Sequence, residues 1–272
     1  MISGEKRADA RAASRVPSPH RKKRVAVGPS PARSFGMTDL TTRLAALDWD
    51  AIAAELDARG LVTTPPVLTP GECAELAALY DEPQHFRSRV DMARHRFGEG
   101  EYQYFARPLP PLVQALRTQA YPHLARVANA WQARLGAHDR FPAELDAFLA
   151  QCAQAGQTRP TPLLLRYTAG GYNCLHRDLY GDVFFPIQLL GFLDRPGQDY
   201  GGGEFLIVEQ RPRAQSAAEV VSGAQGSLAF FTTQVRPVQG TRGVYRVQVR
   251  HGVSRVHWGV RRTLGVIFHD AT

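Results

Sequence analysis

Residues 163–178 read Leu-Leu-Leu-Arg-Tyr-Thr-Ala-Gly-Gly-Tyr-Asn-Cys-Leu-His-Arg-Asp. An apolar run opens this stretch, two glycines interrupt it, and a second short run leads to a histidine and an aspartate. The same texture of short apolar runs between Gly, Pro and Asp continues to the end of the chain, at residues 184–193, 204–208, 227–231, 245–250 and 262–268. Short strands at this spacing predict a closed or double-layered β structure.

The preceding part of the chain, from residue 40 to residue 157, has a helical pattern. Apolar residues recur at helical spacing over 41–47 and 49–56, and the second run ends near Gly60. Thr69 and Pro70, followed by Glu72, have the order of a helix start with a capping box. Two longer helices are predicted at residues 112–135 and 142–155. We therefore predict a helical layer at residues 37–158, packed on the outer face of a sheet.

The composition is that of a globular protein. The chain has 272 residues, enough for one large domain or two small ones, and 44% of them are hydrophobic. No apolar run approaches the roughly 18 residues that span a membrane, so we expect a soluble protein with no membrane partner. The three cysteines are odd in number and lack CxxC spacing, which favours a reducing, cytoplasmic location. Neither oligomeric state nor pathway follows from the sequence.

The net charge of +8 is unevenly distributed. Residues 1–36 hold nine Lys and Arg against two acidic residues, a balance of +7, so the rest of the chain carries +1. This segment is rich in Ala, Ser, Pro and Arg and has no hydrophobic periodicity, which predicts a disordered basic tail. One hypothesis for such a tail is binding to nucleic acid, which would disappear on removal of residues 1–36.

All three lysines precede Met37, whereas the remainder of the chain uses 24 arginines and no lysine. We therefore hypothesise that translation starts at Met37 and that residues 1–36 are absent from the native protein. An intact mass that begins at Met1 would contradict this hypothesis.

The most specific chemical pattern is His176-x-Asp178 with a later His251. Residues two apart on an extended segment leave the same face, so the first two side chains can reach one ion. Two imidazoles and one carboxylate on one side of an octahedral metal leave three positions open, as in non-heme Fe(II) oxygenases. A lone histidine among nine is more often a surface or core residue, so the pattern carries more weight than any member.

Several segments resemble the Fe(II)- and 2-oxoglutarate-dependent dioxygenases. Residues 166–178 are similar to the "RY, then G, then HxD" run of prolyl 4-hydroxylases, and Gly202-Gly203-Glu204 is similar to the family's GGE turn. Residues 226–231 resemble the strand before the distal histidine, and residues 251–264 resemble the ending HxV...G.R.(S/T)L. The resemblance covers roughly residues 160–270. It is closest to a bacterial subgroup linked to AlkB-like repair of damaged nucleic acid.

This resemblance implies an α+β fold with a double-stranded β-helix, or jelly-roll, at residues 159–272. It implies that His176, Asp178 and His251 bind Fe(II). His257 and His269 are competitors for the distal position, but their spacing from the strand-end arginine differs from that of the family.

The resemblance also implies a cosubstrate site. Arg261 and Thr263 alternate onto one face of the last strand and would hold the far carboxylate of 2-oxoglutarate, with Arg262 as the alternative anchor. Tyr167 matches a family position whose hydroxyl helps to bind this cosubstrate. The implied reaction uses O2, releases succinate and CO2, and hydroxylates a C–H bond, with ascorbate as a reductant. Tyr167 as a plain core residue and Arg261 as a surface charge stay open.

The substrate is the least determined feature. The prolyl-hydroxylase-like pattern favours a protein or amino-acid side chain, and the subgroup favours oxidative demethylation of alkylated nucleic acid. A non-catalytic jelly-roll that binds metal is a third reading. A demethylase needs aromatic surfaces near the metal; the candidates are Tyr172, Tyr180, Phe184 and Trp258.

Three further features have two interpretations each. Arg236, Arg242, Arg246 and Arg250 could line a path for phosphates or be ordinary surface arginines. Residues 201–203, all glycine, indicate a tight turn rather than a phosphate loop. Cys174 is either an oxidisable group on the metal-facing side or a small apolar filler.

Overall fold

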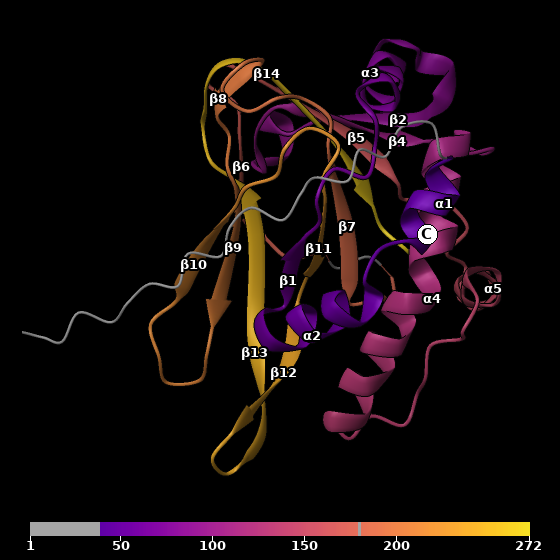
Figure 1. The fold of residues 1–272 in the computed structure, drawn as a ribbon, viewed down its shortest axis with the longest axis vertical. Coiled ribbons are helices and arrows are strands. Elements are labelled where there is room, and N and C mark those ends of the chain that lie inside the picture. The colour runs from indigo at the N-terminus through magenta and orange to yellow at the C-terminus, as the bar shows by residue number, and fades with distance from the viewer. Residues whose placement is uncertain (1–38, 179–180) are drawn as a thin grey trace, which may run out of the picture. The chain divides into compact units, whose positions relative to one another are not determined.

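Two antiparallel sheets enclose the centre of the protein (Figure 1). The computed structural model describes residues 39–178 and 181–272, and the predictions for the tail at residues 1–36 lie outside them. The major sheet has the order β1-β11-β7-β14-β5-β4-β2, with β8 also paired to β14. Its strands are β1 (Leu61–Thr63), β2 (Phe86–Asp91), β4 (Glu101–Phe105), β5 (Leu163–Thr168), β7 (Ile187–Phe192), β8 (Tyr200–Gly202), β11 (Leu228–Thr232) and β14 (Val256–Val266).

The minor sheet has the order β10-β9-β13-β6-β3, and β12 pairs with β13. Its strands are β3 (Gly98–Glu99), β6 (Tyr172–His176), β9 (Phe205–Gln210), β10 (Ala217–Val221), β12 (Val235–Gly240) and β13 (Gly243–Val253). Strands from both sheets contribute to one buried apolar cluster, which includes Phe192, Phe231, Ile207 and Val249. The two sheets therefore pack face to face over a shared core, and the predicted α+β jelly-roll is confirmed.

Helices cover the outer face of the major sheet, as Figure 1 shows for α4 and α5. They are α1 (Leu40–Ala45), α2 (Trp49–Arg59), α3 (Pro70–Ala78), α4 (Pro111–Arg134) and α5 (Leu145–Gln154), with 3₁₀ turns at Leu79–Asp81, Pro83–His85 and Ala93–His95. A second cluster, which includes Leu124 of α4 and Leu264 of β14, fills the space between helices and sheet. Within the described residues, no helix is long and apolar enough to cross a membrane.

The helix ends follow from local capping. The Thr69 side chain accepts a hydrogen bond from the Glu72 amide, while the Glu72 carboxylate accepts one from the Thr69 amide at 2.7 Å. The predicted capping box is therefore confirmed. Gly60 ends α2 with a left-handed φ of 73°, and its amide donates to the Leu56 carbonyl.

The segment from residue 37 to residue 158 is not helical throughout, and this part of the prediction is wrong. Strands β1 and β4 from this segment join the major sheet by pairing with β11 and β5, and β2 extends the sheet from β4. The residues of β4 alternate, so that Gln103 and Phe105 are more buried than Tyr102 and Tyr104. This alternation covers only the five residues of β4, and the helical patterns before and after it in the sequence conceal it.

Candidate metal centre

Three side chains converge between the sheets at the level where β6 pairs with β13. His251 lies opposite His176 in the strand register, and Asp178 lies two residues beyond His176. One carboxylate oxygen of Asp178 is 3.4 Å from His176 Nε2, and the other is 3.4 Å from His251 Nε2. The potential ligand atoms of all three residues lie within 4.8 Å of one another. This arrangement brings together the three residues predicted as metal ligands.

Neighbouring groups orient these side chains. His176 Nδ1 lies 2.8 Å from the Cys174 carbonyl, and this contact directs Nε2 of the ring toward Asp178. Gln188 Nε2 donates to Asp178 Oδ2 at 2.8 Å. The His251 ring is buried, and its centroid is 5.0 Å from that of Phe231. Such outer contacts hold ligands in place before an ion binds.

The protonation states also suit a divalent cation. Burial lowers the pKa of His251 and so favours its neutral form. Burial opposes ionisation of Asp178, but attraction to His251 and hydrogen bonds from both histidines outweigh it and hold its pKa well below the usual value. For His176, burial is outweighed by the hydrogen bond and charge of Asp178, so its pKa is raised. A cation would therefore replace a proton shared within this group.

The predicted cosubstrate residues lie deeper in the same cavity. Tyr167, Arg261 and Thr263 are each 1% exposed or less. Arg261 Nη1 donates to Thr263 Oγ1 at 3.5 Å, while Arg261 Nε and Nη2 have no hydrogen-bond partner within the described part of the chain. Burial raises the pKa of Tyr167 to about 12, so its hydroxyl remains a donor. A buried guanidinium with two unused donors fits a carboxylate ligand.

Arg262 is directed to the opposite face of β14. It makes two hydrogen bonds with the Asp194 carboxylate, at 3.1 and 2.7 Å. Of the competing histidines, His257 is exposed, and His269 accepts a hydrogen bond from the Phe185 amide at 3.3 Å. Neither belongs to the group of potential metal ligands found among the described residues.

A cavity of about 420 Å³ contains the three convergent side chains and the Arg261 guanidinium. Its walls include five residues that the sequence did not point to: Arg96, Phe97, Tyr102, Tyr104 and Gln188. The two tyrosines come from β4, and their rings meet edge to face with centroids 5.4 Å apart. The alternating Glu-Tyr-Gln-Tyr-Phe of residues 101–105 was the one available signal, since it places both tyrosines on one face.

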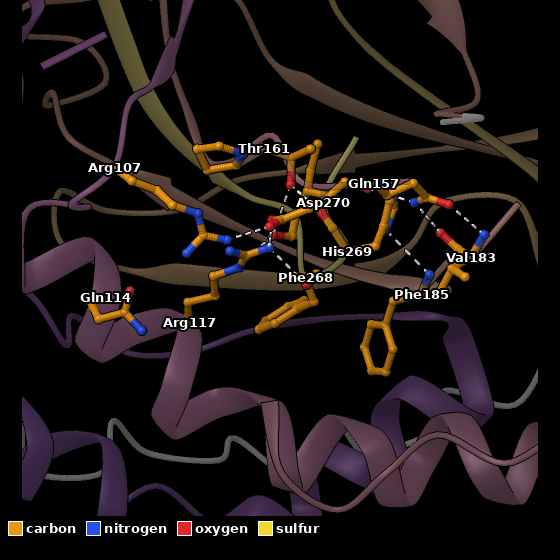
Figure 2. Close-up of polar contacts among 12 residues, drawn as sticks. Arg107, Gln114, Arg117, Gln157, Thr161, Val183, Phe185, Phe268, His269 and Asp270 are labelled. Atoms are coloured by element: carbon orange, nitrogen blue, oxygen red, sulfur yellow. Dashed lines mark hydrogen bonds and ion pairs between the residues drawn. The ribbon is translucent and has the colours of Figure 1, made fainter. Parts of the chain in front are cut away.

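A buried network just after the end of β14 anchors the segment at residues 181–185 (Figure 2). Gln157 Nε2 donates to the carbonyls of Val183 and Asp270, at 2.9 and 2.6 Å, and its oxygen accepts from the Val183 amide at 2.7 Å. A Cβ on Gly181 would lie 2.3 Å from the Gln157 amide carbon, so the backbone at Gly181 passes directly over this side chain. Gln157 thus connects Val183 to the C-terminal segment at Asp270 by hydrogen bonds.

Helix α4 stabilises this network through the side chain of Arg117. Arg117 is 1% exposed and donates to the carbonyls of Ile267 and Phe268 at 3.1 and 2.8 Å, and to Asp270 Oδ1 at 2.8 Å. Arg107 Nη2 reaches the second Asp270 oxygen at 2.5 Å. Figure 2 shows both guanidinium groups directed at this one carboxylate. Both cations therefore share a single carboxylate.

The remaining sequence candidates are distributed differently. Arg236 is buried and donates to Glu209 Oε1 at 2.6 Å, so the hypothesis of a phosphate path is wrong for this residue. The Arg242, Arg246 and Arg250 side chains are exposed. Gly202 and Gly203 have φ values of 72° and 66° between β8 and β9, which is the predicted tight turn. Cys174 is exposed and lines the cavity.

The aromatic candidates also lie in different settings. The Arg255 guanidinium lies over the Tyr172 ring, with its central carbon 4.5 Å from the ring centroid. Trp258 is 47% exposed. The Phe184 ring lies 5.2 Å from that of His269. Tyr180 lies outside the described residues.

A family model described as "Oxygenase, catalysing oxidative methylation of damaged DNA" matches residues 100–271. The chain belongs to this oxygenase family. Two uncharacterized proteins of Mycobacterium tuberculosis, from strains CDC 1551 and H37Rv, are each 47% identical to it over 167 residues, which cover 61% of this chain and 72% of each relative. The predicted membership of an oxygenase family is thereby confirmed.

Two solved structures are similar to the oxygenase in their fold. A Pseudomonas putida prolyl-4-hydroxylase has a TM-score of 0.49 and 15% identity, over 80% of this chain and 96% of the other. An oxidoreductase of the 2OG-Fe(II) oxygenase family from Burkholderia pseudomallei has a TM-score of 0.49 and 16% identity, over 84% and 94%. Likenesses at this level carry no information about substrate.

The residues present fit the metal and cosubstrate that the family implies. Two imidazole nitrogens and a carboxylate form a donor set suited to Fe(II). In the same cavity, the unused donors of Arg261 provide a site for the far carboxylate of 2-oxoglutarate. Fe(II) and 2-oxoglutarate are therefore the implied cofactor and cosubstrate.

Proposed function

We propose that the oxygenase is an Fe(II)- and 2-oxoglutarate-dependent dioxygenase in which His176, Asp178 and His251 hold the metal. Arg261 and Thr263 would bind the far carboxylate of 2-oxoglutarate, and Tyr167 would contribute its hydroxyl to that site. The observation that carries the proposal is the presence, in one cavity, of the three convergent ligands and a buried arginine with two unused donors. The same observation argues against a non-catalytic jelly-roll, which would have no need for the arginine.

The protein's part in the reaction is positioning and exclusion. Bound iron supplies the oxidising chemistry, which consumes O2 and 2-oxoglutarate and yields succinate, CO2 and a hydroxylated C–H bond. Gln188 and the Cys174 carbonyl keep Asp178 and His176 in their ligating orientations. The apolar walls near Phe205 and Phe231 keep water away from His251. Ascorbate is the reductant we expect to restore Fe(II) after uncoupled turnover.

For the substrate, the family description favours alkylated nucleic acid. Hydroxylation of an N-methyl carbon gives an unstable product that loses formaldehyde, so the same site would act as an oxidative demethylase. The tyrosine pair Tyr102 and Tyr104 on the cavity wall offers aromatic surface for a base taken out of its stack. Hydroxylation of a protein or amino-acid side chain is the second candidate, favoured by the prolyl-hydroxylase-like motif at residues 166–178.

The first experiment is an anaerobic titration of metal-free protein with Fe(II) and then 2-oxoglutarate, following the visible charge-transfer band of the chelate. The parent should develop the band, and His251→Ala should not. His257→Ala is the matched control, since that histidine is exposed and outside the ligand group. A folded parent that binds iron without developing the band would overturn the cosubstrate assignment and favour the non-catalytic reading.

Measurement of succinate release then distinguishes between the two candidate substrate classes. Methylated oligonucleotides and peptides are compared as stimulants of succinate formation above the uncoupled rate. Formaldehyde released in proportion to succinate, with methylated oligonucleotide alone, supports demethylation. Stimulation by peptide alone supports the second candidate.

A further inference from the structure

The outer face of the minor sheet carries a group of arginines beside the metal cavity. Along β13, Val247, Val249 and His251 point inward and are buried, so the alternate residues point outward. These are Arg246, Gln248 and Arg250, and all three are exposed.

Arg177 joins this group from the neighbouring strand. Arg177 directly follows the end of β6, where His176 lies opposite His251 of β13. Its Nη1 donates to Gln248 Oε1 at 2.6 Å. Arg177, Arg246 and Arg250 therefore surround Gln248, and we call these four residues the arginine surface.

The arginine surface has no carboxylate to balance it. In the described residues, no ion pair joins Arg177, Arg246 or Arg250 to an acidic side chain, in contrast to Arg195 and Arg262, which bind Asp199 and Asp194 at 2.7 Å. Like charges gathered around one residue repel one another. The fold thus retains a repulsive arrangement that an external anion would relieve.

The neighbouring strands add no negative charge to this face. On β9 and β10 the inward positions are marked by the buried Phe205, Ile207 and Val221. The alternate, outward residues are uncharged: Leu206, Val208, Gln210, Ala218 and Val220. The outer face therefore combines positive charge with apolar and amide groups.

This surface continues into the mouth of the metal cavity. Arg177 lines the cavity as well as the arginine surface. Arg96, Phe97 and Leu175 line it too, and Phe97 and Leu175 are 48% and 42% exposed. A ligand that follows the arginines along β13 therefore reaches a rim with cationic and apolar groups above the metal site.

We propose that the arginine surface binds the phosphate backbone of single-stranded DNA and leads one nucleotide into the metal cavity. The inference deepens the first substrate candidate above and rests on it. Arg246 and Arg250 are separated by ~13 Å along the strand, so an extended polyanion can contact both. A single strand presents its bases to the cavity directly, whereas a base inside a duplex must first be unpaired and flipped out. Exposed Phe97 and Leu175 offer the apolar contacts that unstacked bases prefer.

The test is fluorescence anisotropy of a labelled single-stranded DNA oligonucleotide with the full chain, over a series of salt concentrations. The variant Arg246→Gln/Arg250→Gln is compared with the control Arg126→Gln/Arg140→Gln, which removes the same charge from exposed positions on α4 and in the segment after it. Each lost phosphate contact should lower the salt slope by about 0.7, and the two together should weaken binding roughly tenfold. The weakening should not depend on base sequence.

A second variant, Arg246→Glu/Arg250→Glu, should weaken binding further. If both surface variants bind DNA as tightly as the control, the proposal is overturned. It is also overturned if poly-glutamate displaces the DNA equally well at the same charge concentration, because the surface would then suit any acidic chain. Binding is measured without iron or 2-oxoglutarate, so failure here is distinct from failure to form the charge-transfer band.

Discussion

Arg261 and Arg262 are adjacent in sequence but have opposite environments. Arg261 is buried with two unused donors in the described part of the chain, whereas Arg262 is bound to Asp194. Arg261→Gln should raise the 2-oxoglutarate concentration for half-formation of the charge-transfer band by roughly 10- to 100-fold, because a charge-assisted contact contributes about 1.5–3 kcal/mol.

Arg262→Gln is the matched control for this change. It should lower the free energy of unfolding, since Asp194 is buried, and leave the half-formation concentration as in the parent. An equal rise in both variants would mean that general loss of positive charge, rather than a carboxylate site at Arg261, explains the effect.

Gln188 would act on a bound metal through Asp178. Its amide donates to Asp178 Oδ2, so Gln188→Met should remove one of the contacts that orient the carboxylate and weaken Fe(II) binding by roughly 10- to 100-fold. Gln103→Met is a suitable control, because Gln103 is also buried but donates to the Tyr80 carbonyl at 2.7 Å. The measurement is Fe(II) affinity by competition with a chelator. Equal losses in the two variants would indicate a general packing effect instead.

At the scale of elements, α4 and the end of β14 are joined by a buried charge cluster. Arg117→Met would leave Asp270 with Arg107 as its sole cationic partner among the described residues. Breaking one side of a buried ion pair costs about 3–5 kcal/mol, so we expect a loss of this order in the free energy of unfolding. The double variant Arg117→Met/Asp270→Asn should recover part of it, as chemical denaturation would measure. A double variant no more stable than Arg117→Met would contradict this account.

Element boundaries were predictable where short-range chemistry determines them. Thr69, Pro70 and Glu72 set the start of α3, and Gly60 ends α2, because each acts on residues a few positions away. For strand β6 the sequence predicted an extended segment around His176 but not its bounds, because its five residues are partly exposed on both faces and show no alternation. Its place in the sheet comes from pairing with β13, more than seventy residues later.

For the whole molecule, His269 makes stability sensitive to acid. Burial lowers the pKa of His269 to about 4, against an ordinary value of 6.5. Between these values the unfolded chain binds a proton that the folded protein rejects, so stability is present above pH 6.5 and is lost as the pH falls toward 4. The loss has an upper bound of about 1.4 kcal/mol per pH unit in that window.

Urea denaturation at several pH values would measure this slope. His269→Asn keeps an acceptor for the Phe185 amide but does not titrate, so its stability should fall less between pH 6.5 and 5. A variant with the same slope as the parent would assign the acid sensitivity to other groups.

The sequence pointed to the three convergent side chains better than to the rest of the cavity. His176, Asp178 and His251 are few, chemically distinct and placed in a fixed order on strands that the apolar runs reveal. Gln188 and Tyr102 belong to common residue types, and their positions on the cavity wall depend on how β7 and β4 pair with distant strands. No local pattern records such pairings.

Strand β14 has a different chemical task on each face: Arg261 and Thr263 point into the cavity, while Arg262 holds Asp194 outside it. Deleting one residue between Gly259 and Arg261 would shift the register and exchange the two faces. The Arg262 side chain would then point into the cavity, and Asp194 would lose its hydrogen bonds with Arg262. Evolution and engineering can therefore replace side chains along this strand far more easily than they can change its length.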